Sequence, residues 1–159
     1  EDAFKFIENS TEYYDAIIID LPDPNNSSLA RLYSKEFYKV VSQKLAKEGV
    51  VVTQATIPFF SPEAFGCIQE SLKSAGFKHV RPYHSYVPSF GDWGFMLASK
   101  HNIDISNINI DVPTKYIENS SIEEFFYIPK DVQRTNIKTS TLNNPEILDY
   151  YLSGWKYWD

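Results

Sequence analysis

The sequence predicts an α/β fold with a mostly parallel β-sheet that ends in antiparallel strands. Two short apolar runs, 14–20 and 50–54, are rich in β-branched residues and typical of strands buried in a parallel sheet. Apolar residues at helical spacing lie between these runs, which predicts a crossover helix and therefore parallel strands. Two further strand-like runs, 79–87 and 94–99, are separated by a short loop with Pro and Gly that predicts a hairpin.

The first 33 residues predict a helical turn, a strand and a loop. A short helix is expected over 2–8, with apolar side chains on one side. The run 14–20 ends in the carboxylate of Asp20, and the consecutive apolar residues 16–19 within it predict burial on both faces of the sheet. Residues 21–33 hold two prolines, two asparagines and two serines, so they predict a loop.

Two helices with defined ends are expected next. Ser34 should cap the first helix and Gly49 should end it. Ser61 should cap the second, with Pro62 at its first position and Gly76 just after its end. The residues expected to face the core are Phe37, Val40, Val41 and Leu45 in the first helix and Phe65, Ile68 and Leu72 in the second.

The tail, residues 101–159, is expected to pack on the domain formed by residues 1–100. Residues 101–139 are polar and irregular, with only short helical possibilities. Residues 144–158 predict a helix. Its apolar stripe would consist of Ile147, Leu148, Tyr151 and Trp155.

Charge and composition narrow the classes of function. The net charge of −6 and the lack of a basic stripe argue against nucleic-acid binding. An acidic protein suits cationic small molecules, although solubility explains the same balance. No apolar run approaches the ~20 residues of a membrane span, and no signal peptide is present, which favours an intracellular location. Cys67 is the single cysteine and reads as a small buried hydrophobe, and the histidines lack ligand spacing, so no metal site is expected.

Candidate functional residues follow the predicted strands, because open α/β sheets bind ligands beyond the carboxyl ends of their strands. Asp20 and Asp23 lie three residues apart in a loop stiffened by prolines. They could face one pocket and bind a cationic amine, take its proton or hold a metal. The alternative is structural, with Asp20 capping the loop and Asp23 forming an Asx turn before Pro24.

Three more residues belong to the same expected edge of the sheet. Gln54 could offer its amide to a ligand or could simply be solvated. Phe90 and Trp93, with Tyr86, could form an aromatic wall around an alkyl chain or a cation. Packing at the rim of the sheet explains the same aromatic residues.

Taken in order, several segments resemble the spermidine synthases, a family of polyamine aminopropyltransferases. The matching segments are Asp2-Ala3, residues 14–24, 32–38, 49–54 and 94–100, and the end of the chain from Thr141 to Trp155. The resemblance implies a Rossmann-like sheet, as in S-adenosylmethionine methyltransferases, with residues 1–100 as the C-terminal half of the domain. The first half, with the glycine-rich nucleotide loop, the ribose-binding acid and three strands, would be missing.

The resemblance also implies a reaction. The family transfers an aminopropyl group from decarboxylated S-adenosylmethionine, used as co-substrate, to putrescine or another polyamine, without a metal or a permanently bound cofactor. The residues it implies are Asp20 as the catalytic base, Asp23, Gln54, Phe90 and Trp93 around the polyamine, and Asp2 with Ala3 at the adenine.

Departures from the family pattern leave parts of this reading open. Phe90 stands where many members carry a tyrosine that contacts the polyamine, so the acceptor amine stays open. Leu21-Pro22 replaces a serine-rich pair and is similar to members fused to membrane-spanning N-terminal segments, with this domain on the cytoplasmic side.

The chain is expected to be cut from a longer protein. Its strand 14–20 would then form an unpaired sheet edge, and the piece alone would bind the adenosyl group poorly. A cytoplasmic homo-oligomer is expected. The alternatives are a transferase for another amine, a noncatalytic polyamine-binding or assembly fragment, and a methyltransferase. The Asp20 and Asp23 pair counts against the last, since methyl transfer does not require a diamine to be neutralised.

Overall fold

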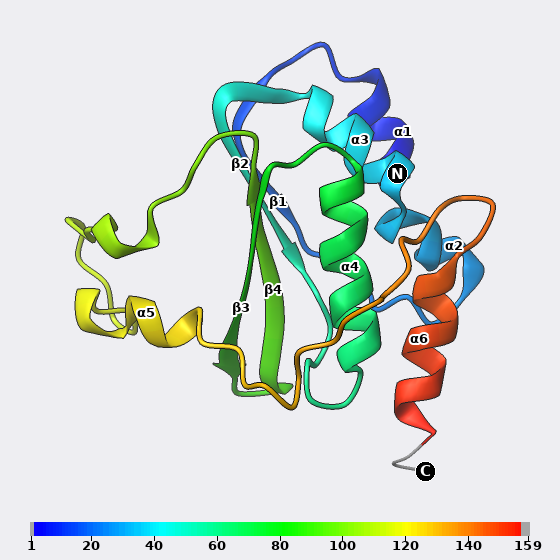
Figure 1. Ribbon diagram of the computed structural model, residues 1–159. Coiled ribbons are helices and arrows are strands. Elements are labelled where there is room, and N and C mark those ends of the chain that lie inside the picture. The colour runs from blue at the N-terminus through cyan, green and yellow to red at the C-terminus, as the bar shows by residue number, and fades with distance from the viewer. Residues whose placement is uncertain (1, 157–159) are drawn as a thin grey trace.

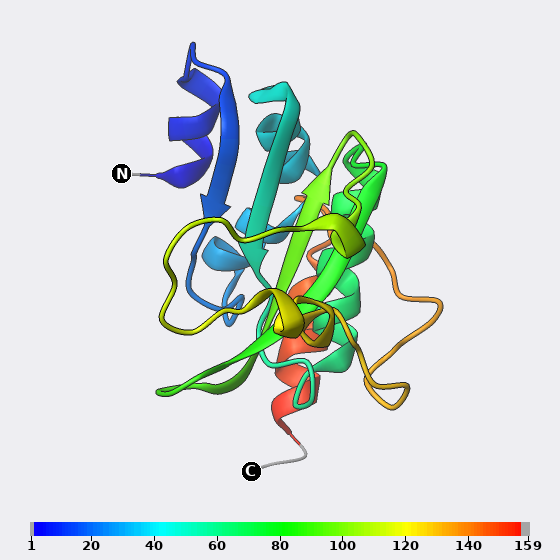
Figure 2. The same ribbon diagram turned by 90° about the vertical axis from the view of Figure 1, so that its left-hand side faces the viewer.

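A four-stranded mixed sheet, in the order β1-β2-β4-β3, forms the centre of the computed structural model, which describes residues 2–156. Strand β1 (Tyr14–Ile19) pairs in parallel with β2 (Leu45–Gln54), and β2 pairs antiparallel with β4 (Gly91–Ser99). Strand β3 (His79–Val87) lies at the far edge, antiparallel to β4. Helices α3, α4 and α6 cover one face, and the segment with α5 crosses the other (Figures 1 and 2).

The helices of the described chain are short. The α-helices are α1 (Ala3–Asn9), α2 (Ser27–Ala30), α3 (Lys35–Gln43), α4 (Pro62–Ser74), α5 (Ile122–Phe125) and α6 (Glu146–Trp155). The 3-10 helices are η1 (Arg31–Tyr33), η2 (Ile105–Asn107) and η3 (Asn119–Ser121). None of the helices in the part of the chain that the structure describes is long and apolar enough to span a membrane.

The α/β fold and the antiparallel C-terminal strands are confirmed, and the described part of the sheet is mixed, whereas a mostly parallel sheet for the whole domain stays a prediction. Within residues 2–156, β1 and β2 form the one parallel pair, and β4 lies inside the sheet between β2 and β3. The predicted hairpin explains this arrangement, because it returns β4 antiparallel to β3. Strand β4 is buried at Met96 and Ala98, whereas β3 has no buried residue, so β4 takes the inner position.

The apolar run of strand β1 predicted burial on both faces of the sheet, but the structure buries the strand on one face only. Ile19 faces the helices and is 8% exposed, whereas Ile18 on the opposite face is 79% exposed. Strand β1 lies at the edge of the described sheet, as expected, and no helix packs over Ile18. At the end of the strand, the alternation of side chains between the two faces therefore separates the exposed Ile18 from the buried Ile19.

The first predicted helix begins where expected and ends early. The Ser34 hydroxyl accepts a hydrogen bond from the Phe37 N–H at 3.2 Å, which confirms the N-cap. The helix ends at Gln43, and Gly49 lies within β2 instead of ending it. A Cβ atom at Gly49 would lie 2.9 Å from the carbonyl oxygen of Tyr14, so this glycine permits the close approach of β1 and β2.

The second predicted helix, α4, also has one unexpected end. Pro62 occupies its first turn, and Gly76 follows it with a φ of 101°, as predicted. Ser61 holds the N-cap position, but its hydroxyl donates to the carbonyl of Tyr150 instead of capping the helix. The predicted inner face, with Phe65, Ile68 and Leu72, is buried.

The loop predicted over 21–33 contains two short helices, α2 and η1. Asn26 caps α2, since its side chain accepts a hydrogen bond from the Leu29 N–H at 3.1 Å. Because the segment is rich in Pro and Asn, its sequence predicts a loop, and Asn26 is not recognisable as a helix cap. These turns place Tyr33, which is 1% exposed, beneath the residues that follow β1.

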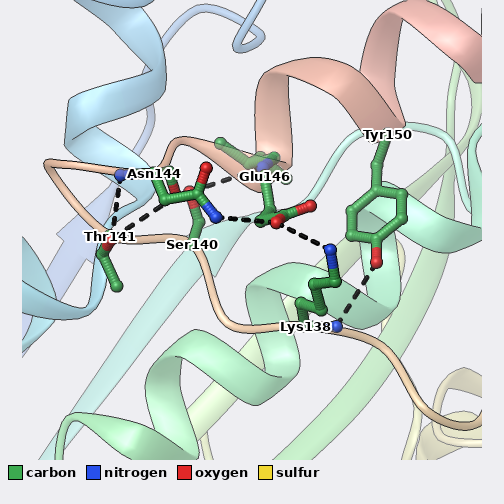
Figure 3. Close-up of polar contacts among 7 residues, drawn as sticks. Lys138, Ser140, Thr141, Asn144, Glu146 and Tyr150 are labelled. Carbon is green, nitrogen blue, oxygen red and sulfur yellow. Dashed lines mark hydrogen bonds and ion pairs between the residues drawn. The ribbon is translucent and has the colours of Figure 1, made fainter.

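The C-terminal segment reaches the helical layer through a polar cluster (Figure 3). The predicted terminal helix is present as α6, and the last two residues of the expected range, 157 and 158, lie outside the described residues. Glu146 in its first turn accepts hydrogen bonds from Lys138 at 3.0 Å and Asn144 at 2.7 Å. Helix α6 packs on α4 and buries Ile147 completely.

Cys67 lies in α4 and is fully buried, as predicted. Burial raises the pKa of its thiol to about 12. The thiol is therefore protonated and serves as a small apolar side chain.

Replacing Ile147 by alanine tests how much α6 contributes to the fold. Ile147 is 0% exposed, so Ile147→Ala should lower the free energy of unfolding by about 2–5 kcal/mol. Leu152→Ala in the same helix is the matched control, because Leu152 is 44% exposed and should change stability by less than about 1 kcal/mol. Urea unfolding of the two variants measures the difference, and equal losses would contradict the described packing of α6.

Candidate functional site

A cavity of about 650 Å³ lies beyond the carboxyl ends of β1 and β2. The loop after β1, the end of β2 and the β3–β4 turn enclose it, and its volume is that of a small-molecule site. Its lining residues are Ile18, Ile19, Asp20, Leu21, Pro22, Asp23, Val52, Gln54, Val87, Phe90, Trp93 and Phe95.

The register of the sheet builds the floor of this cavity. Ile18 is paired with Val52 across β1 and β2, and Gln54 is paired with Phe95 across β2 and β4. Because residues two apart on a strand share a face, these side chains lie on the face opposite to α3 and α4. The exposed side chain of Ile18 therefore forms part of the cavity lining.

The lining carries two carboxylates, Asp20 and Asp23, and no lysine, arginine or histidine. This charge favours a cation, and the apolar floor favours a molecule with an aliphatic part. A second cavity, beside α4 and β3, has Arg81 and Arg134 in its lining and suits cations less well. Among residues 2–156, no group of three or more His, Cys, Asp or Glu side chains is placed to hold a metal ion.

Asp20 is exposed at the end of β1 and faces the cavity. Its carboxylate forms no hydrogen bond or ion pair with any residue between 2 and 156, so it does not cap the loop. A carboxylate in this state is available to a ligand and to a proton.

Asp23 is half-buried and held by two side chains from distant elements. Its Oδ1 accepts a hydrogen bond from Gln54 Nε2 at 3.3 Å, and its Oδ2 accepts one from the Tyr151 hydroxyl at 3.0 Å. Its carboxylate therefore contacts β2 and α6 in place of the predicted Asx turn. Burial raises the pKa of Asp23, and the hydrogen bonds from Tyr151 and Gln54 oppose that shift.

Gln54 is 4% exposed, and its amide is engaged at both ends. Its nitrogen donates to the Leu21 carbonyl at 2.8 Å and also contacts the Tyr33 hydroxyl. Its oxygen accepts hydrogen bonds from Trp93 Nε1 at 3.1 Å and from the Thr56 N–H at 2.9 Å. The amide thus positions neighbouring residues, and a contact with a polyamine stays a prediction.

Two positioning residues were missed by sequence reasoning. Thr56 has a φ of 61°, in the left-handed region that β-branched residues avoid, and this conformation directs its N–H to Gln54. The Tyr33 hydroxyl donates to the Pro22 carbonyl at 2.9 Å, and burial raises the pKa of Tyr33, so the hydroxyl keeps its proton. Tyr33 lies in the matching segment 32–38, but no local pattern indicates its contact with the loop after β1, and Thr56 lies outside the matching segments.

The aromatic wall forms from Phe90 and Trp93, whose ring centroids lie 5.1 Å apart. Trp93 is anchored to Gln54, whereas Phe90 is 62% exposed at the β3–β4 turn. Tyr86 does not line the cavity.

Asp2 and Ala3 lie apart from this cavity, at the beginning of α1. Asp2 caps the helix, accepting a hydrogen bond from the Phe4 N–H at 3.0 Å, and it forms an ion pair with Arg31. The hydrogen bond from Arg31 holds the pKa of Asp2 below its usual value. A role for either residue at an adenine stays a prediction.

The chain also resembles known proteins in sequence and in fold. The model of the spermine/spermidine synthase domain matches residues 1–111. A polyamine aminopropyltransferase of Oceanobacillus iheyensis is 38% identical over an alignment of 159 positions, which covers 98% of this chain and 31% of that protein. Polyamine aminopropyltransferase 2 of Ralstonia nicotianae is 36% identical over 155 residues, 97% of this chain and 30% of its own length. The chain thus spans under a third of the length of these relatives.

Two solved structures share the fold. A spermidine synthase in complex with the transition-state analogue AdoDATO superimposes with a TM-score of 0.71 at 23% identity, over 83% of this chain and 47% of the other. Spermidine synthase from Thermotoga maritima gives a TM-score of 0.67 at 24% identity, over 80% of this chain and 45% of the other.

The structure is an α/β domain with a carboxylate-lined cavity at the carboxyl edge of its sheet. The chain belongs to the spermine/spermidine synthase family, as the resemblance implied.

Replacing Asp23 by asparagine tests the burial of its carboxylate. Because the folded-state pKa lies above the ordinary 3.8, ionisation of Asp23 opposes folding as the pH rises through that value. The free energy of unfolding of the Asp23→Asn variant, minus that of the unsubstituted protein, should therefore increase with pH above 3.8 and then level off. Urea unfolding at several pH values measures this difference, with the exposed Asp111→Asn as control. A difference that falls with pH would show that the pKa is lowered.

Proposed function

We propose that the protein carrying this chain transfers an aminopropyl group from decarboxylated S-adenosylmethionine to putrescine and so forms spermidine. The observation that carries the proposal is an unpartnered carboxylate, Asp20, which faces the same apolar cavity as the anchored carboxylate Asp23. Membership of the family supports the reaction class.

The reaction needs a neutral nitrogen. The attacking nitrogen forms a bond to the methylene carbon next to the sulfonium, and the carbon–sulfur bond breaks with its electron pair going to sulfur. A free alkylamine is almost fully protonated at neutral pH, with a pKa near ~10.4 for lysine-like groups. A base beside the reacting nitrogen removes that proton, and Asp20 is the cavity carboxylate that has no protein partner among residues 2–156.

Asp23 suits a different task, which is to hold the amine without exchanging its proton. Its two oxygens are fixed by Gln54 and Tyr151, so its charge has a defined place. The apolar floor with Ile18 and Val52 would accompany the methylene chain between the amines. Nitrogen atoms at both ends of a diamine therefore meet carboxylates, and the carbon atoms meet apolar side chains.

A longer acceptor is the second candidate, and Phe90 favours it. Phe90 stands at the mouth of the cavity, is 62% exposed and offers no hydroxyl to a polyamine. An amine longer than putrescine could pass along its ring.

A panel of amines separates these candidates. With the full-length protein and decarboxylated S-adenosylmethionine, we expect the highest kcat/KM for putrescine among a monoamine, diamines of increasing length and spermidine. Phe90→Tyr should alter the relative kcat/KM of the amines by a few fold and leave the KM of the co-substrate unchanged. A higher kcat/KM for spermidine than for putrescine would favour the longer acceptor, and no transfer to any amine would favour a noncatalytic role.

Replacing Asp20 tests the assignment of the base. Asp20→Asn should lower kcat by about 100-fold or more at neutral pH, because a positioned base contributes on the order of 10²–10⁴. The deficit should narrow as the pH rises toward the pKa of the amine, near ~10.4, since the amine then loses its proton to water.

Asp15→Asn is the matched control for Asp20→Asn. Asp15 is exposed on the same strand and does not line the cavity, so this variant should keep its activity. Steady-state kinetics between neutral and alkaline pH compare the two variants. A fully active Asp20→Asn enzyme would exclude the base assignment.

A further inference from the structure

We propose that Tyr151 is a positioning residue for Asp23, so that the C-terminal helix α6 takes part in binding the amine. The inference rests on the proposed function, because that function assigns Asp23 to the amine. It deepens the site by adding a residue that does not line the cavity itself.

The geometry of the contact supports this role. The Tyr151 hydroxyl lies 3.0 Å from Asp23 Oδ2, and Gln54 Nε2 lies 3.3 Å from Asp23 Oδ1. Two donors from different elements, α6 and β2, thus hold the two oxygens of one carboxylate. The terminal torsion of an aspartate is broad, so one donor alone leaves the carboxylate free to turn, whereas two donors fix its plane.

Helix α6 is placed firmly enough to act in this way. A Cβ atom at Gly154 would lie 2.5 Å from the Ser61 hydroxyl and 2.8 Å from the Phe60 carbonyl, so α6 lies directly against the beginning of α4. The ring of Tyr151 lies 6.1 Å from that of Trp155, centroid to centroid. The polar cluster around Glu146 fixes the other end of the helix (Figure 3).

The electrostatics agree with a donor role for the phenol. Burial and the neighbouring Asp23 raise the pKa of Tyr151, so its hydroxyl keeps its proton. The titratable groups that face Asp23 in the described chain are Tyr151 from α6, Tyr33 from η1 and Asp20 from the same loop. The hydrogen bond from Tyr151 lowers the pKa of Asp23, so its removal should raise that pKa further.

Tyr151→Phe in the full-length protein tests the inference. The KM for the amine should rise by about tenfold, because a hydrogen bond to a charged group is lost, while kcat and the KM for decarboxylated S-adenosylmethionine change by less than about threefold. The acid limb of kcat/KM for the amine should also move to higher pH, because Asp23 would ionise at higher pH.

Tyr150→Phe is the matched control. The Tyr150 hydroxyl accepts a hydrogen bond from the Lys138 backbone N–H at 3.4 Å (Figure 3), and Tyr150 does not line the cavity. This variant should leave the KM for the amine and the acid limb unchanged. In the background of Asp23→Asn, Tyr151→Phe should have little further effect on the KM for the amine.

Two results would overturn the inference. One is an unchanged KM and an unchanged acid limb in Tyr151→Phe. The other is a fall in kcat together with an equal rise in both KM values, which would indicate general damage to the domain.

An independent measurement separates this inference from the proposed function. If the parent protein transfers no aminopropyl group to any amine, the proposed function fails. The contact is then tested by a double-mutant cycle of Asp23→Asn and Tyr151→Phe in urea unfolding. Non-additive changes support the positioning of Asp23 by Tyr151, and additive changes overturn it.

Discussion

The buried amide of Gln54 joins parts of the molecule that are far apart in the sequence. Its nitrogen reaches the loop after β1 at the Leu21 carbonyl, and its oxygen accepts a hydrogen bond from Trp93 near the β3–β4 turn. At 4% exposure, each partner that is lost would leave a desolvated polar group, at about 1–3 kcal/mol. The loop, the strand and the hairpin therefore keep one relative arrangement, and the cavity between them keeps its shape.

The two carboxylates of the cavity have different surroundings, and the proposed function gives them different tasks. Asp20 is exposed and has no partner among residues 2–156, whereas Asp23 is half-buried between Gln54 and Tyr151. The raised pKa of Asp23 means that its negative charge is incompletely compensated by the protein. A bound cation would supply the missing compensation in this otherwise apolar setting, as the proposed function requires.

Much of the architecture follows from local sequence patterns, and the exceptions have long-range causes. The run 14–20 predicts a strand, but its periodicity does not show that β1 lies at the edge with Ile18 exposed. Gly49 fits a helix end as well as a close contact between strands, and the nearby carbonyl of Tyr14 decides between them. The order of β3 and β4 in the sheet depends on which of the two strands has more side chains to bury.

The residues of the cavity also divide into those that local sequence patterns predict and those whose role has a long-range cause. Asp20, Asp23, Gln54, Phe90 and Trp93 were all selected as residues at strand ends, and the structure places all of them around one cavity. The hydroxyl of Tyr151 reaches Asp23 over a separation of 128 residues, which no local pattern reveals. Thr56 acquires its role from an unusual backbone conformation, and the sequence carries no glycine there to signal it.

The prolines on either side of Asp23 have a consequence for substrate choice. Pro22 and Pro24 have no N–H group, so two of the five residues from Asp20 to Pro24 can offer no backbone donor to a ligand. A carboxylate group on a ligand would lose its hydration here and meet oxygen atoms of the same partial charge. Under the proposed function, the loop would therefore disfavour an amino acid relative to the amine that its decarboxylation gives.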